Sequence, residues 1–233
     1  MRIIAFLLVF YGSCFACISA HCETIVSGSC ADGINSSCEW TIDLDRGILT
    51  LSGNGEMASY SVAEAPWYEY RNSIESVIVG SGISNISYAA FWNHLQLQNV
   101  KFETDANGQT ALTSIDSWAF GETHISDIVI PDTVTDVGYY AFAISSVNGP
   151  KLMNVVIPDS LKNIGENAFA SQLREGANFY CPADKADMCR EALSNSDKTQ
   201  QEINQMLKIY TKEGNRYVLD GQKYKTLADM QKK

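Results

Sequence analysis

The stretch at 128–142, IVIPDTVTDVGYYAF, decides the fold, because the same frame returns at 155–169 as VVIPDSLKNIGENAF. Two weaker copies precede it, so that four units end in an Ala-Phe pair, with phenylalanines 29, 22 and 27 residues apart. Units of this length that share apolar positions and vary in their polar letters are typical of repeats that stack on one another. The pairs are Ala90-Phe91, Ala119-Phe120, Ala141-Phe142 and Ala168-Phe169.

Each unit contains a three-residue run rich in β-branched residues, which predicts a short parallel strand whose first and third side chains point inward. Pro131 and Pro158 directly follow two of these runs, where a missing N–H costs no ladder hydrogen bond. Aliphatic residues five and eight positions before each Ala-Phe phenylalanine are expected to reach the core from the opposite wall. The runs are VIV at 77–79, VKF at 100–102, IVI at 128–130 and VVI at 155–157.

The second unit carries an insertion, TDANGQ at 104–109, between its strand and its wall. Asp105, Asn107 and Gly108 are similar to part of a calcium-binding loop, but the other ligands of such a loop are missing. We therefore expect a polar surface bulge here and no metal site.

The pattern L-x-x-V-x-I-P-D-x-V/L-x-x-I/V-G-x-x-A-F resembles the BspA-like leucine-rich repeats of secreted and surface bacterial proteins. It covers 74–169, with departures at Gly80-Ser81 in the first unit and Glu103 in the second. Together, the repeats and the resemblance predict an α/β-type solenoid that is leucine-rich-repeat-like, with short parallel strands and an irregular or short-helical convex side. The segment before the repeats also resembles the family, at Trp40, Gly53, Gly55, Met57, Pro66, Trp67 and Tyr68.

The first residues are a basic start, a short apolar run and several small residues, which predicts a secretory signal peptide at 1–20. The run is too short for a membrane span of about 20 residues. A lipoprotein modified at Cys14 or Cys17 stays open as an alternative, although the residues before each cysteine fit that signal poorly. We expect a secreted, extracellular or cell-surface protein without a transmembrane segment in the mature chain, and a periplasmic location also stays open.

A stack of repeats exposes apolar core at its ends unless other segments cover it. We expect 21–73 to form an N-terminal β cap, because 40–53 alternates polar and apolar residues around Asp45-Arg46-Gly47, as a β-hairpin does. Four repeats and a terminal partial strand are expected at 74–180.

The last segment, 181–233, is expected to be a C-terminal α+β appendage. Its composition and apolar spacing predict helices at 184–196 and 200–210. Asp220-Gly221 is a strong signal for a two-residue hairpin turn.

Export implies an oxidising compartment, so the spacing of the cysteines predicts two short-loop disulfides. A metal site is disfavoured, because neither pair has CxxC spacing and no histidine lies near either one. Cys22 is left over, as a free thiol or as a competitor for Cys38. The expected disulfides are Cys30–Cys38 and Cys181–Cys189.

Charge is unevenly placed along the chain. Residues 21–180 hold 6 Lys and Arg against 19 Asp and Glu, whereas 181–233 hold 10 against 8. We call residues 21–180 the acidic body of the chain. Its negative charge argues against nucleic acid or an anionic membrane as the partner. The simplest explanation of the acidity is solubility after export.

Residues that could carry chemistry are few. The histidines are His21, His94 and His124, and the chain has no HExxH, G-x-S-x-G, phosphate-loop or CxxC motif. Asp43 and Asp45 form a D-x-D at a predicted turn, where Asp is favoured for structural reasons. We therefore predict no enzyme, no catalytic residues and no cofactor, with a surface glycan hydrolase as the least favoured alternative.

The middle residue of each strand, and the residue two positions before it, are expected to point out of the sheet. Three of the four middle residues are aliphatic, and exposed aliphatic residues in a row can mark a protein-contact face. The simpler alternative is that short strands favour Val and Ile. The candidate binding residues are Ser76, Ile78, Asn99, Lys101, Asp127, Val129, Asn154 and Val156.

These observations favour a non-catalytic protein-interaction or adhesion module. Its partner would be an extracellular protein or surface component that the sequence does not identify. A structural exoprotein that self-assembles through an exposed edge or through Cys22 stays open as the alternative.

Overall fold

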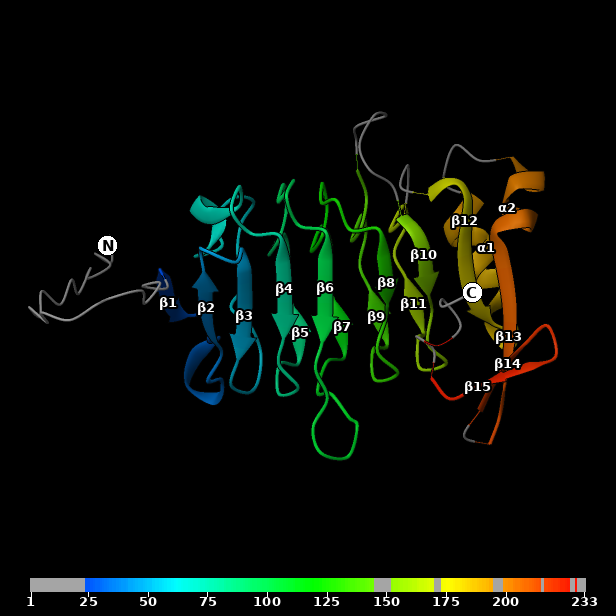
Figure 1. The fold of residues 1–233 in the computed structure, drawn as a ribbon, viewed down its shortest axis with the longest axis horizontal. Coiled ribbons are helices and arrows are strands. Elements are labelled where there is room, and N and C mark those ends of the chain that lie inside the picture. Colours follow the sequence, from blue (N-terminus) through cyan, green and yellow to red (C-terminus); the bar gives the residue numbers. More distant parts are fainter. Residues whose placement is uncertain are drawn as a thin grey trace, which may run out of the picture.

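The computed structural model describes residues 24–144, 152–169, 173–194, 199–214, 216–226 and 229. The predicted signal peptide and Cys22 lie outside these residues. Short strands run side by side along the length of the molecule, and the α-helices gather at its C-terminal end (Figure 1). Neither of the two α-helices in the described part of the chain is long and apolar enough to span a bilayer.

An antiparallel meander begins the fold. Strands β2 and β3 form the hairpin predicted around Asp45-Arg46-Gly47, and β1 pairs with the outer edge of β2. The predicted Cys30–Cys38 disulfide is confirmed and ties β1 to the start of β2. Because β3 pairs in parallel with β4, the meander joins the first repeat directly. The elements are β1 (Ile25–Ser29), a 3-10 turn (Gly33–Asn35), β2 (Glu39–Asp43), β3 (Ile48–Ser52) and a 3-10 turn (Tyr68–Tyr70).

The three-residue runs form the predicted strands. Their inward side chains alternate with the outward ones, and Val77, Ile128 and Val155 are at most 1% exposed. Neighbouring repeats pair in parallel, β4 with β6 and β8 with β10. We call these strands the first ladder: β4 (Ser76–Val79), β6 (Asn99–Phe102), β8 (Asp127–Val129) and β10 (Leu152–Val156).

The opposite wall is a second ladder of two-residue strands that pair in parallel without a break. The expectation of an irregular or short-helical side is therefore wrong for the described part of the repeats. Close approach of successive repeats explains the difference: a Cβ on Gly138 would lie 2.3 Å from the backbone N of Ser117, and one on Gly165 would lie 2.4 Å from that of Tyr139. The strands are β5 (Asn85–Ile86), β7 (Ser114–Ile115), β9 (Asp136–Val137) and β11 (Asn163–Ile164).

The phenylalanines of the Ala-Phe pairs stack face to face through the core. The three successive centroid distances, from Phe91 to Phe169, are 5.2, 5.4 and 5.3 Å, with interplanar angles of 13° or less. Trp67 stacks on the first ring, and Phe179 meets the last ring edge-on. The phenylalanines that recur in each repeat therefore hold neighbouring repeats together through aromatic contacts and burial.

The C-terminal segment continues the first ladder, because β10, β12 and β13 pair in parallel. The predicted helix at 200–210 is wrong in its second half: α2 ends at Met206, and the chain continues directly as β13, which pairs with β12. Thr199 and Glu202 form a capping box at the start of α2. The elements are β12 (Leu173–Pro182), a 3-10 turn (Ala183–Lys185), α1 (Ala186–Ser194), α2 (Gln200–Met206), β13 (Leu207–Glu213), β14 (Arg216–Leu219) and β15 (Gln222–Tyr224).

Two further predictions for this segment are confirmed. The Cys181–Cys189 disulfide links β12 to α1. Strands β14 and β15 form an antiparallel hairpin around Asp220-Gly221, both of which have positive φ, as a two-residue turn of this kind requires.

Candidate functional site

The first ladder is interrupted between β6 and β8. One sheet has the order β1-β2-β3-β4-β6 and the next β15-β14-β13-β12-β10-β8, while the second ladder is continuous. Within the described residues, no backbone hydrogen bond joins β6 to β8. Just before these strands, the backbone N–H of His124 donates to the carbonyl of Leu97 at 2.9 Å. A backbone hydrogen bond therefore joins the second and third repeats just before β6 and β8, whereas β6 and β8 themselves are not paired.

This opening exposes part of the core. Val100 and Phe102 are the inward residues of β6, yet both are only half-buried, whereas the corresponding Ile128 and Ile130 of the next repeat are at most 1% exposed. In a closed ladder, side chains of β8 would cover them, but β8 does not pair with β6. Apolar surface that other repeats bury is therefore accessible here.

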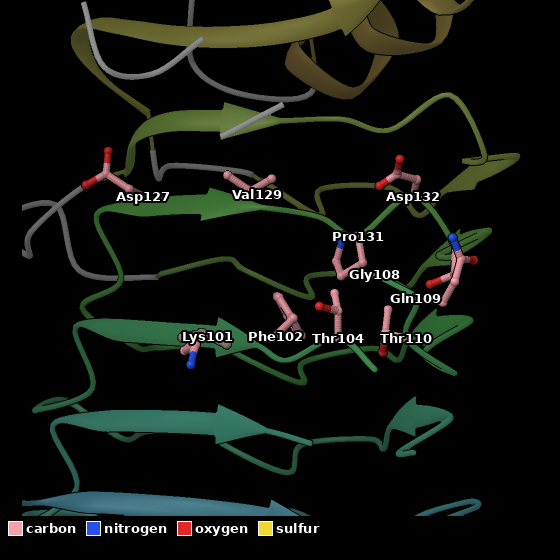
Figure 2. Close-up of a pocket in the computed structure, with 12 residues that line it drawn as sticks. Lys101, Phe102, Thr104, Gly108, Gln109, Thr110, Asp127, Val129, Pro131 and Asp132 are labelled. Carbon is pink, nitrogen blue, oxygen red and sulfur yellow. The ribbon is translucent and has the colours of Figure 1, made fainter. Parts of the chain in front are cut away.

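A cleft of about 490 Å³ occupies the opening. Figure 2 shows Lys101 and Phe102 on one of the two flanking strands and Asp127 and Val129 on the other. The inserted loop closes one end of the cleft. The cleft is lined by Val100, Lys101, Phe102, Thr104, Gly108, Gln109, Thr110, Asp127, Val129, Pro131, Asp132 and Thr133.

The carboxylate of Asp105 organises the inserted loop from within. One of its oxygens accepts hydrogen bonds from the backbone N–H groups of Asn107 and Gln109, both at 2.9 Å. These bonds, that from Gln109 first, lower the pKa of Asp105. Among the described residues, no group of three or more His, Cys, Asp or Glu side chains could hold a metal ion. The geometry of Asp105 therefore fits a polar turn.

The cleft brings together three of the eight candidate binding residues: Lys101, Asp127 and Val129. Lys101 pairs with Glu103 at 3.1 Å, and both side chains are well exposed. Asn99 is exposed at the start of β6, although it does not line the cleft. Ser76 and Ile78 are half-buried on β4, the neighbouring strand.

Asn154 belongs to a row of polar side chains across the strand starts. Its amide donates to the carboxylate of Asp127 at 2.5 Å and its carbonyl oxygen accepts from Asn178 at 3.0 Å. Ser126 also donates to Asp127. These bonds fix the carboxylate of Asp127 at the edge of the cleft.

The expectation that Val156 is exposed is wrong, since its exposed fraction is 0%. The side chain does leave the main core, but a second apolar cluster covers it, and Val129 is partly buried against the same cluster. The Tyr210 hydroxyl donates to the carbonyl of Ile157 at 2.6 Å and anchors this cover. The cluster contains Val156, Tyr180, Tyr210, Tyr217 and Leu219.

The C-terminal hairpin therefore ends the accessible face near β8. The hydroxyl of Tyr217, on β14, donates to the carboxylate of Asp132 at 2.9 Å, at the rim of the cleft. Burial raises the pKa of Tyr217, and the neighbouring Asp132 raises it further, so this hydroxyl stays protonated and acts as a donor. Tyr210, Tyr217 and Tyr224, which are seven residues apart, were a sequence signal for such a cover, but their target could not be read from the sequence.

The two histidines in the described part of the chain, His94 and His124, lie outside the cleft. His94 is fully buried, and burial lowers its pKa to about 4. Burial also lowers the pKa of His124, which is only partly exposed. Neither side chain lines the opening between β6 and β8.

Comparison with solved structures finds bacterial leucine-rich repeat proteins. A leucine-rich repeat protein from Eubacterium ventriosum shares 21% identity over 84% of this chain and 49% of its own, with a TM-score of 0.48. One from Bacteroides ovatus shares 17% identity over 61% of this chain and 39% of its own, with a TM-score of 0.40. A leucine rich cell surface protein from Faecalibacterium prausnitzii shares 17% identity over 81% of this chain and 60% of its own, with a TM-score of 0.28.

This chain spans less than two thirds of the length of each of these structures. No curated protein matches it. The family model described as "BspA type Leucine rich repeat region" matches residues 64–200 with six copies, two more than the four complete units visible in the sequence. The matched region is more than half of the chain and contains both ladders. The chain therefore belongs to the family of BspA-type leucine-rich repeat proteins.

Proposed function

We propose that the protein is a secreted or cell-surface interaction module that binds an extracellular protein or surface component and has no catalytic role. The contact face is the outer face of β4, β6 and β8. The observation that carries the proposal is the cleft, where Lys101, Asp127 and Val129 stand around half-buried core side chains. An accessible apolar surface edged by charged groups is typical of a site that binds another protein.

Export is part of the proposal. It is supported by the signal-peptide pattern at 1–20 and by two disulfides, which persist in oxidising compartments. The family supports a bacterial source, and a role in adhesion is part of the proposal. The ligand is taken to be a protein rather than nucleic acid because residues 21–180 are acidic.

The proposed organisation is a short solenoid with a cover at each end. In it, 21–73 caps the first repeat, 74–180 carries the stack, and 181–233 closes the far end. The stacking of Trp67 on Phe91 and the edge-on contact of Phe179 with Phe169 support these roles, because they place aromatic rings over the two end repeats.

A double variant of the cleft tests the binding role. Asp127→Lys reverses the charge at the edge of the cleft, and Val129→Lys places an ammonium group on the outer face of β8. The immobilised protein and the variant are compared for the amount of cell-surface material that they retain, with Asp136→Asn on the second ladder as the control. We expect the double variant to lose most of the binding at unchanged circular dichroism, whereas equal retention by a folded double variant refutes the proposal.

A further inference from the structure

We propose that the opening between β6 and β8 accepts an extended segment of a partner polypeptide that carries basic side chains. The segment joins the first ladder as an added strand. This inference rests on the proposed function and names the chemistry of the partner at the same cleft.

The backbone at the opening presents unpaired strand edges. In a strand, the N–H and C=O groups of successive residues point alternately to the two sides. On β6, the N–H of Glu103 donates to Val79 of β4, so the backbone groups of Val100 and Phe102 face the opening. On β8, the N–H of Ile130 donates to Val156 of β10.

By the same alternation, Asp127 and Val129 turn their backbone groups toward β6. No backbone bond between the two strands satisfies these groups within the described residues. Two edges that would pair in a closed ladder therefore face one cleft, and unpaired strand edges are a template for another chain.

An added strand can pair with the open backbone edges and cover the accessible apolar side chains at the same time. Its own N–H and C=O groups pair with the open edges, as in other complexes in which a strand is added to a sheet. Alternate side chains of the added strand cover Val100 and Phe102. The residues at the corresponding positions of the other repeats are already buried. A compact ligand could fill the cleft, but it would leave the row of backbone groups along each strand unpaired.

Charge determines the kind of segment. Lys101 is the only basic residue among those that line the cleft, and it already pairs with Glu103. On the other side, the hydrogen bonds that Asp127 and Asp132 accept from described residues come from neutral groups, an amide and hydroxyls. A segment with alternating apolar and basic side chains therefore complements the apolar floor and the carboxylates.

The probe is the blocked hexapeptide acetyl-Lys-Val-Lys-Val-Lys-Val-amide, titrated into the full mature chain by calorimetry. Hydrogen exchange of the complex is followed residue by residue. We expect saturable binding and slower exchange of the Val100, Phe102, Asp127 or Val129 amides, with no change at Ile78 of the closed ladder. Absence of binding, or binding without protection at any of the four amides, overturns the proposal.

The chain offers a matched pair of variants for the charge argument. Asp127 accepts from Asn154 and Ser126 on the first ladder, and Asp136 accepts from Asn163 and Thr135 on the second. Asp127→Asn is expected to weaken peptide binding about threefold at low salt, the effect of one exposed ion pair, and Asp136→Asn to leave it unchanged. Equal weakening by both variants shows attraction to the acidic body as a whole and contradicts a site at the cleft.

Modified peptides separate strand pairing from charge. N-methylation of every peptide bond keeps the charges but removes the donors, so we expect binding to fall at least tenfold; full retention overturns strand pairing. The proposed function is tested separately: if the Asp127→Lys, Val129→Lys variant loses its native binding while the peptide gives no protection, the contact face stands and the added strand is wrong. If that variant binds normally, the contact face itself is wrong.

Discussion

The burial of His94 predicts a loss of stability between pH 7 and pH 5. The side chain is 0% exposed, its Nδ1 lies 3.1 Å from the carbonyl oxygen of Trp92, and its Nε2 has no hydrogen-bond partner among the described residues. Burial lowers the pKa of His94 to about 4, against an ordinary value of 6.5. The folded state therefore binds a proton less readily than the unfolded chain, and the free energy of unfolding falls as the pH drops below the unfolded value.

The magnitude follows from the two pKa values. At pH 5 the unfolded imidazole is almost fully protonated, while only about a tenth of the folded imidazole is, so that His94 lowers the free energy of unfolding by about 2 kcal/mol relative to pH 7. The loss levels off near pH 4, where the folded protein also takes up the proton.

Urea denaturation followed by tryptophan fluorescence at pH 7 and pH 5 measures this difference. His94→Asn keeps a short N–H donor for the Trp92 carbonyl but does not titrate in this range. We expect the variant to be less stable than the wild type at pH 7, because the smaller side chain leaves a cavity, but to lose about 2 kcal/mol less on acidification. His124→Asn, at a less buried histidine, is the control and should keep most of the wild-type loss.

Carboxyl groups titrate in the wild type and in the variants alike, so their effect cancels in the comparison. Equal losses of free energy for the wild type and His94→Asn between pH 7 and pH 5 would refute the reasoning. If the loss of stability on acidification disappears in His124→Asn but persists in His94→Asn, then His124 causes it and the reasoning about His94 is wrong.

Three further predictions concern stability and can be checked by urea or thermal denaturation. Phe120→Ala removes a ring stacked between two others and should cost about 3–5 kcal/mol, with a much smaller loss contradicting the role of the stack. Gly138→Ala should lower the free energy of unfolding more than Gly108→Ala, for which we expect a loss of about 1 kcal/mol. The added Cβ at Gly108 has open space and is strained only by the positive φ, whereas at Gly138 it meets the backbone of a neighbouring repeat. Equal losses would show that the close approach of repeats is unimportant for stability. Tyr210→Phe leaves the buried carbonyl of Ile157 without its donor and should cost about 1–2 kcal/mol, detected as loosening of the C-terminal hairpin in hydrogen exchange; unchanged exchange would mean that the bond does not anchor it.

The sequence was sufficient wherever a feature depends on local patterning. Alternation along three residues determines which side chains of a strand face inward, as at Ile128 and Ile130, and short separation favours the pairing of Cys30 with Cys38. The turn at Asp220-Gly221 follows from residues that tolerate positive φ. Prediction was weaker where a partner strand overrides local propensity: the apolar stripe of 200–210 suits a helix, but pairing with β12 makes a strand from Leu207 onward.

By itself, the amino-acid sequence determined that repeats stack, which letters form their core, and which residues face out of the strands. Only the tertiary structure decided which of those outward residues are accessible. Val156 is covered by tyrosines far along the chain, and Lys101, Asp127 and Val129 meet at an opening between β6 and β8. The physical reason is that inward and outward are properties of one strand, whereas exposure depends on the spacing of neighbouring repeats and on contacts between segments distant in sequence.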